Sequence, residues 1–154
     1  MSERKIEFSV FRSFGRRTMK LMAIDYGDSR TGVAFSDKRE ILASPYTVIH
    51  ESYQPKLIEK LLEIIATEEA EKIIIGLPRN MDGSFGYRCD ACRALGEALS
   101  EKCDIPIDYQ DERLTTIMAH NVLSQNNVRG KKRKDTVDAV SAVMILQSYI
   151  DSKK

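Results

Sequence analysis

The stretch 21–34 places the strongest constraint on the fold of this chain. An apolar run, 21–24, ends in a carboxylate at Asp25, and the chain then turns through Gly27 before a second apolar run, 32–34. This pattern predicts two strands of a hairpin, with Asp25 at the end of the first. Because that strand is apolar up to its last residue, we expect it to be central and buried.

The carboxylate of Asp25 is then predicted to lie at the rim of the core, where water is scarce. An unpaired charge in such a place costs several kcal/mol or shifts the pKa until the group is neutral. The candidate partners of Asp25 are a metal ion, a phosphate held through a metal, or an arginine such as Arg30. The structural alternative is a turn aspartate that accepts hydrogen bonds from backbone N–H groups.

Length and composition indicate one soluble domain. With 154 residues the chain can bury a substantial core, and we expect 19–154 to form a single domain and 1–18 to be an N-terminal extension. No apolar run reaches the length of a membrane span, the N-terminus lacks the apolar segment of a secretion signal, and three cysteines do not suit a disulfide framework. We therefore expect a cytoplasmic protein.

Positive charge is concentrated in two segments. The net charge is +1, yet 1–20 carries six Lys or Arg against two Glu, and 129–134 carries five basic residues and no acid. The remainder holds 13 basic and 21 acidic residues. An acidic body with two basic segments is suited to contact a polyanion at chosen places.

The hydrophobic periodicity predicts the order β-β-β-α-β-α-β-α-α. Three antiparallel strands followed by α/β units indicate an α/β fold, in which a five-stranded mixed sheet has helices on both faces. Pro45 marks the third strand as an edge strand. The predicted strands are 21–25, 31–36, 41–49, 72–78 and 105–109; the predicted helices are 55–70, 85–102, one from Thr115 or Thr116 through Leu123, and 135–150, with 125–134 as a mobile loop.

Three carboxylates form the strongest chemical candidate: Asp25, Glu112 and Asp138. In a sheet of this kind ligands bind outside the carboxyl ends of the parallel strands, where Asp25 and Glu112 are expected. Three acids in one place repel one another, and a divalent cation relieves that; hard oxygen ligands favour Mg²⁺ or Mn²⁺. Such a site can hydrolyse a phosphodiester. The alternative is that Asp135 caps the last helix with Asp138 in a capping-box-like pair, while Glu112 pairs with an arginine.

Several basic or polar residues are candidates for binding a nucleic-acid backbone. The basic run precedes Asp135 directly, and the connection 76–84 resembles a helix N-terminus that binds phosphate, with Ser84 as an ordinary N-cap in the alternative view. Arg88 could assist there. The predicted nucleic-acid-binding residues are Arg30, Arg79, Asn80, Arg113, Arg129, Lys131, Lys132, Arg133 and Lys134.

The sequence Cys89-Asp90-Ala91-Cys92 is a Cys-x-x-Cys motif inside the helix predicted for 85–102. A zinc site needs further ligands that His50 and His120 do not obviously supply, and a redox motif would sit at the first turn after a strand. We therefore assign no chemistry to these cysteines. The side of this helix expected to pack is formed by Tyr87, Ala91, Ala94, Leu95, Ala98 and Leu99.

The chain resembles the YqgF family of small RNase H-like proteins. Four blocks carry the resemblance: Ile24 to Ala34, Gly76-Leu77-Pro78 through Gly83, Asp111 to Thr116, and Val137-Asp138-Ala139 through Tyr149. Family members are described as pre-16S ribosomal RNA nucleases and as Holliday-junction-resolvase-like nucleases. The resemblance implies that the metal-binding acids are Asp25, Glu112 and Asp138, and that residues 1–18 are additional.

The resulting expectation is a Mg²⁺- or Mn²⁺-dependent nuclease, a hydrolase acting on RNA in 5′ processing of a 16S rRNA precursor. One alternative is cleavage of DNA four-way junctions, which requires two active sites and hence a dimer. A second is a nucleic-acid-binding factor in transcription or ribosome assembly without catalysis. A third is part of an actin or sugar-kinase fold, since Asp25-Tyr26-Gly27 followed by Gly32 is similar to its phosphate-binding hairpin. We expect no membrane partner, and either a monomer or a homodimer.

Overall fold

The computed structural model describes residues 19–152 except Lys38, Ile41, 79–85 and 112–129, and it gives the backbone alone for 130–138. The predicted extension 1–18 and the predicted helix that ends at Leu123 therefore lie outside the described residues.

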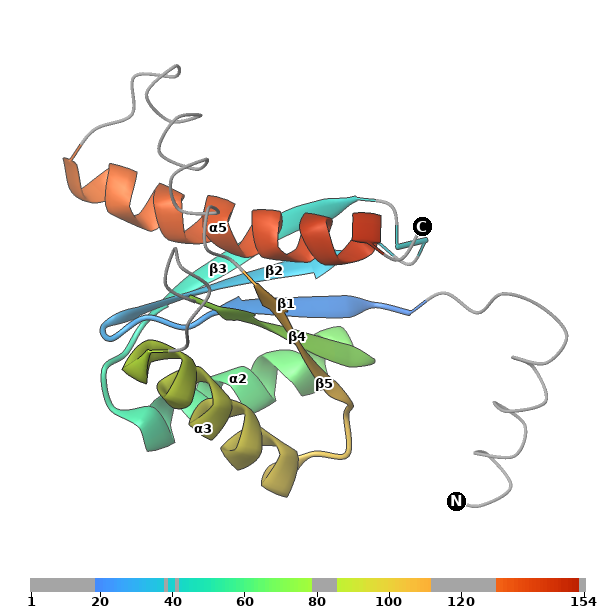
Figure 1. Cartoon of the computed structure of the whole chain (residues 1–154), viewed down its shortest axis with the longest axis horizontal. Coiled ribbons are helices and arrows are strands. Elements are labelled where there is room, and N and C mark those ends of the chain that lie inside the picture. The colour runs from blue at the N-terminus through green and yellow to red at the C-terminus, as the bar shows by residue number, and fades with distance from the viewer. Residues whose placement is uncertain (1–18, 38, 41, 79–85, 112–129, 153–154) are drawn as a thin grey trace, which may run out of the picture.

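The described residues form a five-stranded sheet in the order β3-β2-β1-β4-β5, as Figure 1 shows. The strands are β1 (Leu21–Asp25), β2 (Arg30–Ser36), β3 (Ala43–His50), β4 (Lys72–Leu77) and β5 (Ile107–Asp111). β1 pairs antiparallel with β2, and β2 with β3, whereas β4 is parallel to β1 and β5 to β4. This confirms the predicted mixed sheet with three antiparallel strands followed by parallel α/β units.

Strand β1 is the middle strand of the sheet, and both of its faces are buried. Met22 and Ile24 belong to one hydrophobic cluster, and Leu21 and Ala23 belong to a second cluster on the opposite face. Alternation of side chains along a strand accounts for this division. β3 lies at an edge, as Pro45 predicted, and its pairing with β2 shifts register beside Pro45, between Val33 and Ala34. A proline is tolerated at an edge or an irregularity because no ladder hydrogen bond there requires the N–H that proline lacks.

Helices cover both faces of the sheet. α2 (Gln54–Glu68) and α3 (Tyr87–Lys102) lie on one side, and α5 (Gly130–Ser152) lies across the other (Figure 1). Two hydrogen bonds tie the C-terminal part of α5 to the sheet: the Tyr149 hydroxyl donates to Asp108 Oδ2 at 3.0 Å, and the Ala43 N–H donates to Gln147 Oε1 at 3.0 Å. The C-terminal end of α5 is therefore held near the N-terminal ends of β3 and β5.

The packing side of α3 differs in part from the prediction, which is confirmed for Leu95 and Leu99. Its buried residues are Cys89, Cys92, Leu95, Gly96 and Leu99, whereas Tyr87 is 75% exposed and Ala94 is exposed. The buried residues recur at intervals of three and four, which is one face of a helix. The prediction gave weight to the large tyrosine and to the alanines, but Gly96 is where the helix approaches the sheet closely enough to exclude a Cβ, and the apolar cysteines pack on the same face. The helix begins after Gly86, so Ser84 is not its N-cap.

The start of α5 also differs from the prediction. The segment 130–134, predicted to be part of a mobile loop, is the first part of α5, which begins at Gly130 rather than Asp135. Lysine and arginine have high intrinsic helix propensity, so a basic run is compatible with a helix even though positive charge is unfavourable at a helix N-terminus. Five residues exceed the usual uncertainty of a helix boundary. Asp135 and Asp138 therefore lie inside the helix, and the interpretation of this pair as a helix cap is wrong.

Candidate active site

Asp25 is the last residue of β1, where it pairs with Gly32 of β2 and is half-buried. Strand alternation puts it on the same face as Leu21 and Ala23, whose cluster includes Ala142 and other residues of α5. Asp25 thus lies on the α5 face of the sheet. The prediction of a carboxylate at the rim of a buried central strand is confirmed.

The carboxyl ends of three parallel strands meet beside Asp25. β1 ends at Asp25, β4 ends at Leu77, and β5 ends at Asp111, which pairs with Leu77. On β5, Asp108 contacts Tyr149 of α5, so alternation puts Gln110 on the α5 face as well. Figure 1 shows that the N-terminal end of α5 lies at the same end of the molecule as the end of β1. Strand ends and the start of α5 therefore surround one edge of the sheet.

The turn that follows Asp25 is held on several sides. The Arg88 guanidinium donates to the Tyr26 carbonyl at 2.6 Å and to Asp28 Oδ1 at 2.5 Å, and it lies 5.6 Å from the centre of the Tyr26 ring. The Glu51 N–H donates to the Ser29 carbonyl at 3.1 Å. Nothing in the sequence pointed to these contacts of Arg88, because 62 residues separate it from Tyr26.

At Gly27 the turn is too tight to accommodate a side chain. A Cβ built at this position would overlap the backbone carbonyl oxygen of Arg30 and lie 3.4 Å from its carbon. Since a backbone carbonyl cannot rotate away as a side chain does, the position requires glycine. The two ends of the turn are thus brought together by a residue that has no side chain.

The predicted site residues fall into three groups. Asp25 and Arg30 are described, and both have interactions within the protein. Asp138, Lys131, Lys132, Arg133 and Lys134 lie on α5, with the backbone alone described. Glu112, Arg79, Asn80, Arg113 and Arg129 lie outside the described residues. The described side chains hold no cluster of three potential metal ligands, and only one member of the predicted trio, Asp25, is among them. Convergence of the trio therefore stays a prediction.

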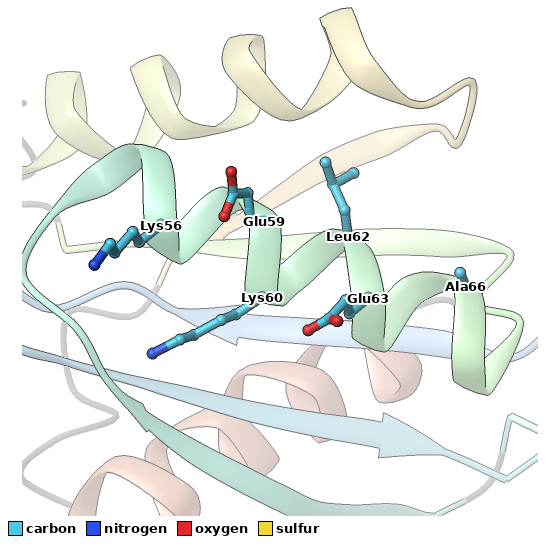
Figure 2. Close-up of a pocket in the computed structure, with 6 residues that line it drawn as sticks. All are labelled: Lys56, Glu59, Lys60, Leu62, Glu63 and Ala66. Carbon is cyan, nitrogen blue, oxygen red and sulfur yellow. The ribbon is translucent and has the colours of Figure 1, made fainter.

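Two other features of the described residues, the Cys-x-x-Cys motif and a hollow on α2, carry no candidate site. Cys89 and Cys92 form no disulfide and are fully buried in the core, where they serve as small apolar packing residues. Figure 2 shows a shallow hollow whose six lining residues, Lys56, Glu59, Lys60, Leu62, Glu63 and Ala66, all belong to α2. A hollow lined by a single helix, with four charged side chains, is a solvated helix surface.

Within the described part of the chain, no helix combines the length and apolar character needed to cross a membrane.

Comparison with known structures shows the fold. The chain superposes on Thermus thermophilus RuvC in complex with a Holliday junction substrate with a TM-score of 0.54 and 13% identity, covering 88% of this chain and 95% of that one. For the fowlpox virus resolvase bound to Holliday junction DNA, the TM-score is 0.57 at 10% identity, covering 88% and 99%. This confirms the RNase H-like fold that the family resemblance implied.

Sequence comparison shows the family. Proteins named "Putative pre-16S rRNA nuclease" are 42% identical in Heliobacterium modesticaldum, over 88% of this chain and 91% of the relative, and 38% identical in Streptococcus sanguinis, over 86% and 98%. Residues 19–152 match the family model described as "RuvX: Holliday junction resolvase". The family model matches most of the chain, and the relatives are similar over most of their own length. This protein therefore belongs to the RuvX family, which is the same as the YqgF family expected from the four sequence blocks.

Proposed function

We propose that this protein is a divalent-metal-dependent nuclease that hydrolyses phosphodiester bonds in RNA, at the 5′ end of a 16S rRNA precursor. The names of its relatives and the description of its family both denote nucleases. The observation that carries the chemical proposal is the position of Asp25, a half-buried carboxylate at the end of the central strand, beside the carboxyl ends of β4 and β5.

The proposed metal ligands are Asp25, Glu112 and Asp138. Glu112 follows directly on the last residue of β5, and position 138 lies one helical turn before Ala142, which packs in the same cluster as Ala23 of β1. Carboxylate oxygens are the donors that Mg²⁺ and Mn²⁺ prefer, so the chemistry of Asp25 fits such an ion. When bound, the ion would supply charge neutralisation and activation of water.

The protein's own part is to fix Asp25 and to bring the phosphate to it. β1 fixes the backbone of Asp25 through pairing on both sides, with β2 and β4. The proposed contacts to the nucleic-acid backbone come from Arg30, Arg79, Asn80, Arg113 and the basic run 129–134. Positive side chains bind phosphates without regard to base sequence, so this set would hold the strand while the acids orient the scissile bond.

The test is cleavage of a 5′-extended 16S rRNA precursor by the wild type and by Asp25→Asn, with Mg²⁺ or Mn²⁺. Loss of residues that only orient metal ligands costs about 10–100-fold, so loss of a ligand itself should cost about 100-fold or more. Asp104→Asn is the matched control, because Asp104 is exposed and precedes β5 at the opposite edge of the sheet. Equal cleavage by the wild type and Asp25→Asn would refute the carboxylate mechanism.

A second candidate substrate is a four-way DNA junction, which the description of the family favours. The same assay with a junction in place of RNA separates the two substrates. Junction resolution needs two active sites on opposed strands, so it also predicts a homodimer by sedimentation. Binding of nucleic acid without turnover under either metal would instead support a non-catalytic factor. A cytoplasmic location and a separate role for residues 1–18 stay predictions.

A further inference from the structure

We propose that Arg88 is a positioning residue, which holds the turn after Asp25 and so fixes the Asp25 carboxylate for metal binding. This inference rests on the proposed function of Asp25. The sequence suggested Arg88 only as an aid to phosphate binding beside 76–84, whereas its guanidinium is turned toward the protein's own turn. Its side chain is 24% exposed, so it is a partly buried component of this edge.

The three contacts of Arg88 use the shape of the guanidinium. One terminal nitrogen donates to the Tyr26 carbonyl and the other to the Asp28 carboxylate, while the guanidinium also lies close to the Tyr26 ring. A planar fork with donors in fixed directions can make two such bonds at once and also lie against an aromatic ring. The ammonium group of lysine is a compact point charge and cannot reproduce this set.

The turn depends on such support because strand pairing stops beside it. The ladder between β1 and β2 ends at the pair of Asp25 with Gly32, so residues 26–29 project beyond the sheet. Tyr26 is bonded to Asp25, and the Tyr26 carbonyl belongs to the next peptide group, so a shift of that group is passed through the Tyr26 Cα to the backbone of Asp25, which carries the carboxylate. Arg88 holds this end of the turn, and the Glu51 N–H holds the other end at Ser29.

The two polar contacts of Arg88 are unequal. The Asp28 side chain is 84% exposed, so water and salt screen its attraction to the guanidinium. The Tyr26 carbonyl belongs to a half-buried residue directly after Asp25. We therefore expect the bond to Tyr26 to contribute most, and Asp28→Asn to have a smaller effect than Arg88→Ala.

The test compares the wild type with Arg88→Ala, Arg88→Lys and Asp28→Asn. Lys102→Ala is the matched control, because it removes an exposed basic side chain from the last turn of the same helix. Three quantities are measured: the Kd for Mn²⁺ by titration calorimetry, the hydrogen exchange of the backbone amides of 27–30, and the kcat and KM for RNA cleavage.

In both Arg88 variants, we expect Mn²⁺ affinity and kcat to fall about tenfold, the lower end of the effect of residues that orient metal ligands. Exchange of the 27–30 amides should be faster, while KM, the exchange of the β4 amides and all properties of Lys102→Ala stay at their wild-type values. A residue that only contributed positive charge would be replaced by lysine without loss, so full activity and Mn²⁺ affinity in Arg88→Lys would overturn the proposal.

Two other outcomes also overturn it. One is an unchanged Mn²⁺ affinity in Arg88→Ala, and the other is faster exchange spread evenly over the turn and β4, which would indicate a general loss of stability. If the wild type cleaves neither RNA nor a DNA junction, the proposed function fails, but Mn²⁺ binding and amide exchange still decide the role of Arg88.

Discussion

Replacement of Gly96 by alanine tests the packing of α3 on the sheet. Gly96 is buried in the middle of α3. A Cβ at this position would overlap the Tyr109 hydroxyl and lie 3.2 Å from Tyr109 Cζ and 3.3 Å from Ile75 Cδ1. The substitution therefore sets two opposed effects against each other, because alanine favours a helix while the added methyl group crowds β4 and β5.

The magnitudes of the two effects decide the sign. Alanine in place of glycine favours a helix interior by about 1 kcal/mol. Inserting a methyl group into a packed core costs about 1–3 kcal/mol, and here the rigid Tyr109 ring must move. Subtracting the first effect from the second leaves a cost of about 0–2 kcal/mol, so we expect Gly96→Ala to lower the free energy of unfolding by about 1 kcal/mol. For a chain of this size the loss corresponds to a fall in Tm of about 2–4 °C.

The second substitution, Tyr109→Phe, isolates the cause. Phenylalanine removes the oxygen that a Cβ at 96 would overlap, so the double variant should regain the stability lost in Gly96→Ala. Unfolding by heat and by urea measures all four proteins, and Ala94→Gly at an exposed site of the same helix calibrates the helix propensity. A Gly96→Ala protein more stable than the wild type, or no coupling with Tyr109→Phe, would refute the reasoning.

Two further substitutions test contacts at opposite ends of the strands. Burial and the hydrogen bond to Asp108 raise the pKa of Tyr149 above its ordinary value of 10.0, although the nearby Lys72 opposes them. The folded protein thus holds the phenolic proton more tightly than the unfolded chain does. The resulting contribution to the free energy of unfolding is present below pH 10.0 and is lost as pH rises through the folded-state pKa of Tyr149. Tyr149→Phe should cost about 1 kcal/mol at pH 7 by urea unfolding and show a smaller alkaline loss, and an unchanged alkaline profile would contradict this. Gly27→Ala should destabilise by about 1–3 kcal/mol and reduce Mn²⁺ affinity, since the added Cβ meets backbone at Arg30; wild-type Mn²⁺ affinity in a folded variant would argue against it.

The strands were predictable because their patterns are local. β1 was predicted at the bounds observed, and β2, β4 and the edge position of β3 followed from apolar runs and Pro45. The prediction of 105–109 for the fifth strand was two residues too early, because β5 spans Ile107–Asp111. Both the burial of a strand and the interruption by proline depend on neighbours in sequence. The RNase H-like arrangement could be predicted only from the family resemblance, because periodicity limits the topology only to a mixed sheet with helices on both faces.

Helix boundaries and helix faces were less predictable. Gly130 to Lys134 looked like a loop because charge and glycine are common in loops, yet these residues form the start of α5. On α3, Cys89, Cys92 and Gly96 pack in place of Tyr87. Both errors arise because polar or small residues suit more than one environment, and the tertiary contact decides among them.

The sequence by itself determined that a carboxylate ends the central buried strand, since an apolar run, an acid and a glycine turn allow little else. It also determined the family, through four short blocks in order. Only the tertiary structure decided that Asp25 faces α5 and that β4 and β5 end beside it. It also decided that Arg88 donates a hydrogen bond to the turn at Tyr26, 62 residues away in the sequence. These facts depend on strand register, parity of alternation and helix placement, which are set by packing between segments distant in the chain.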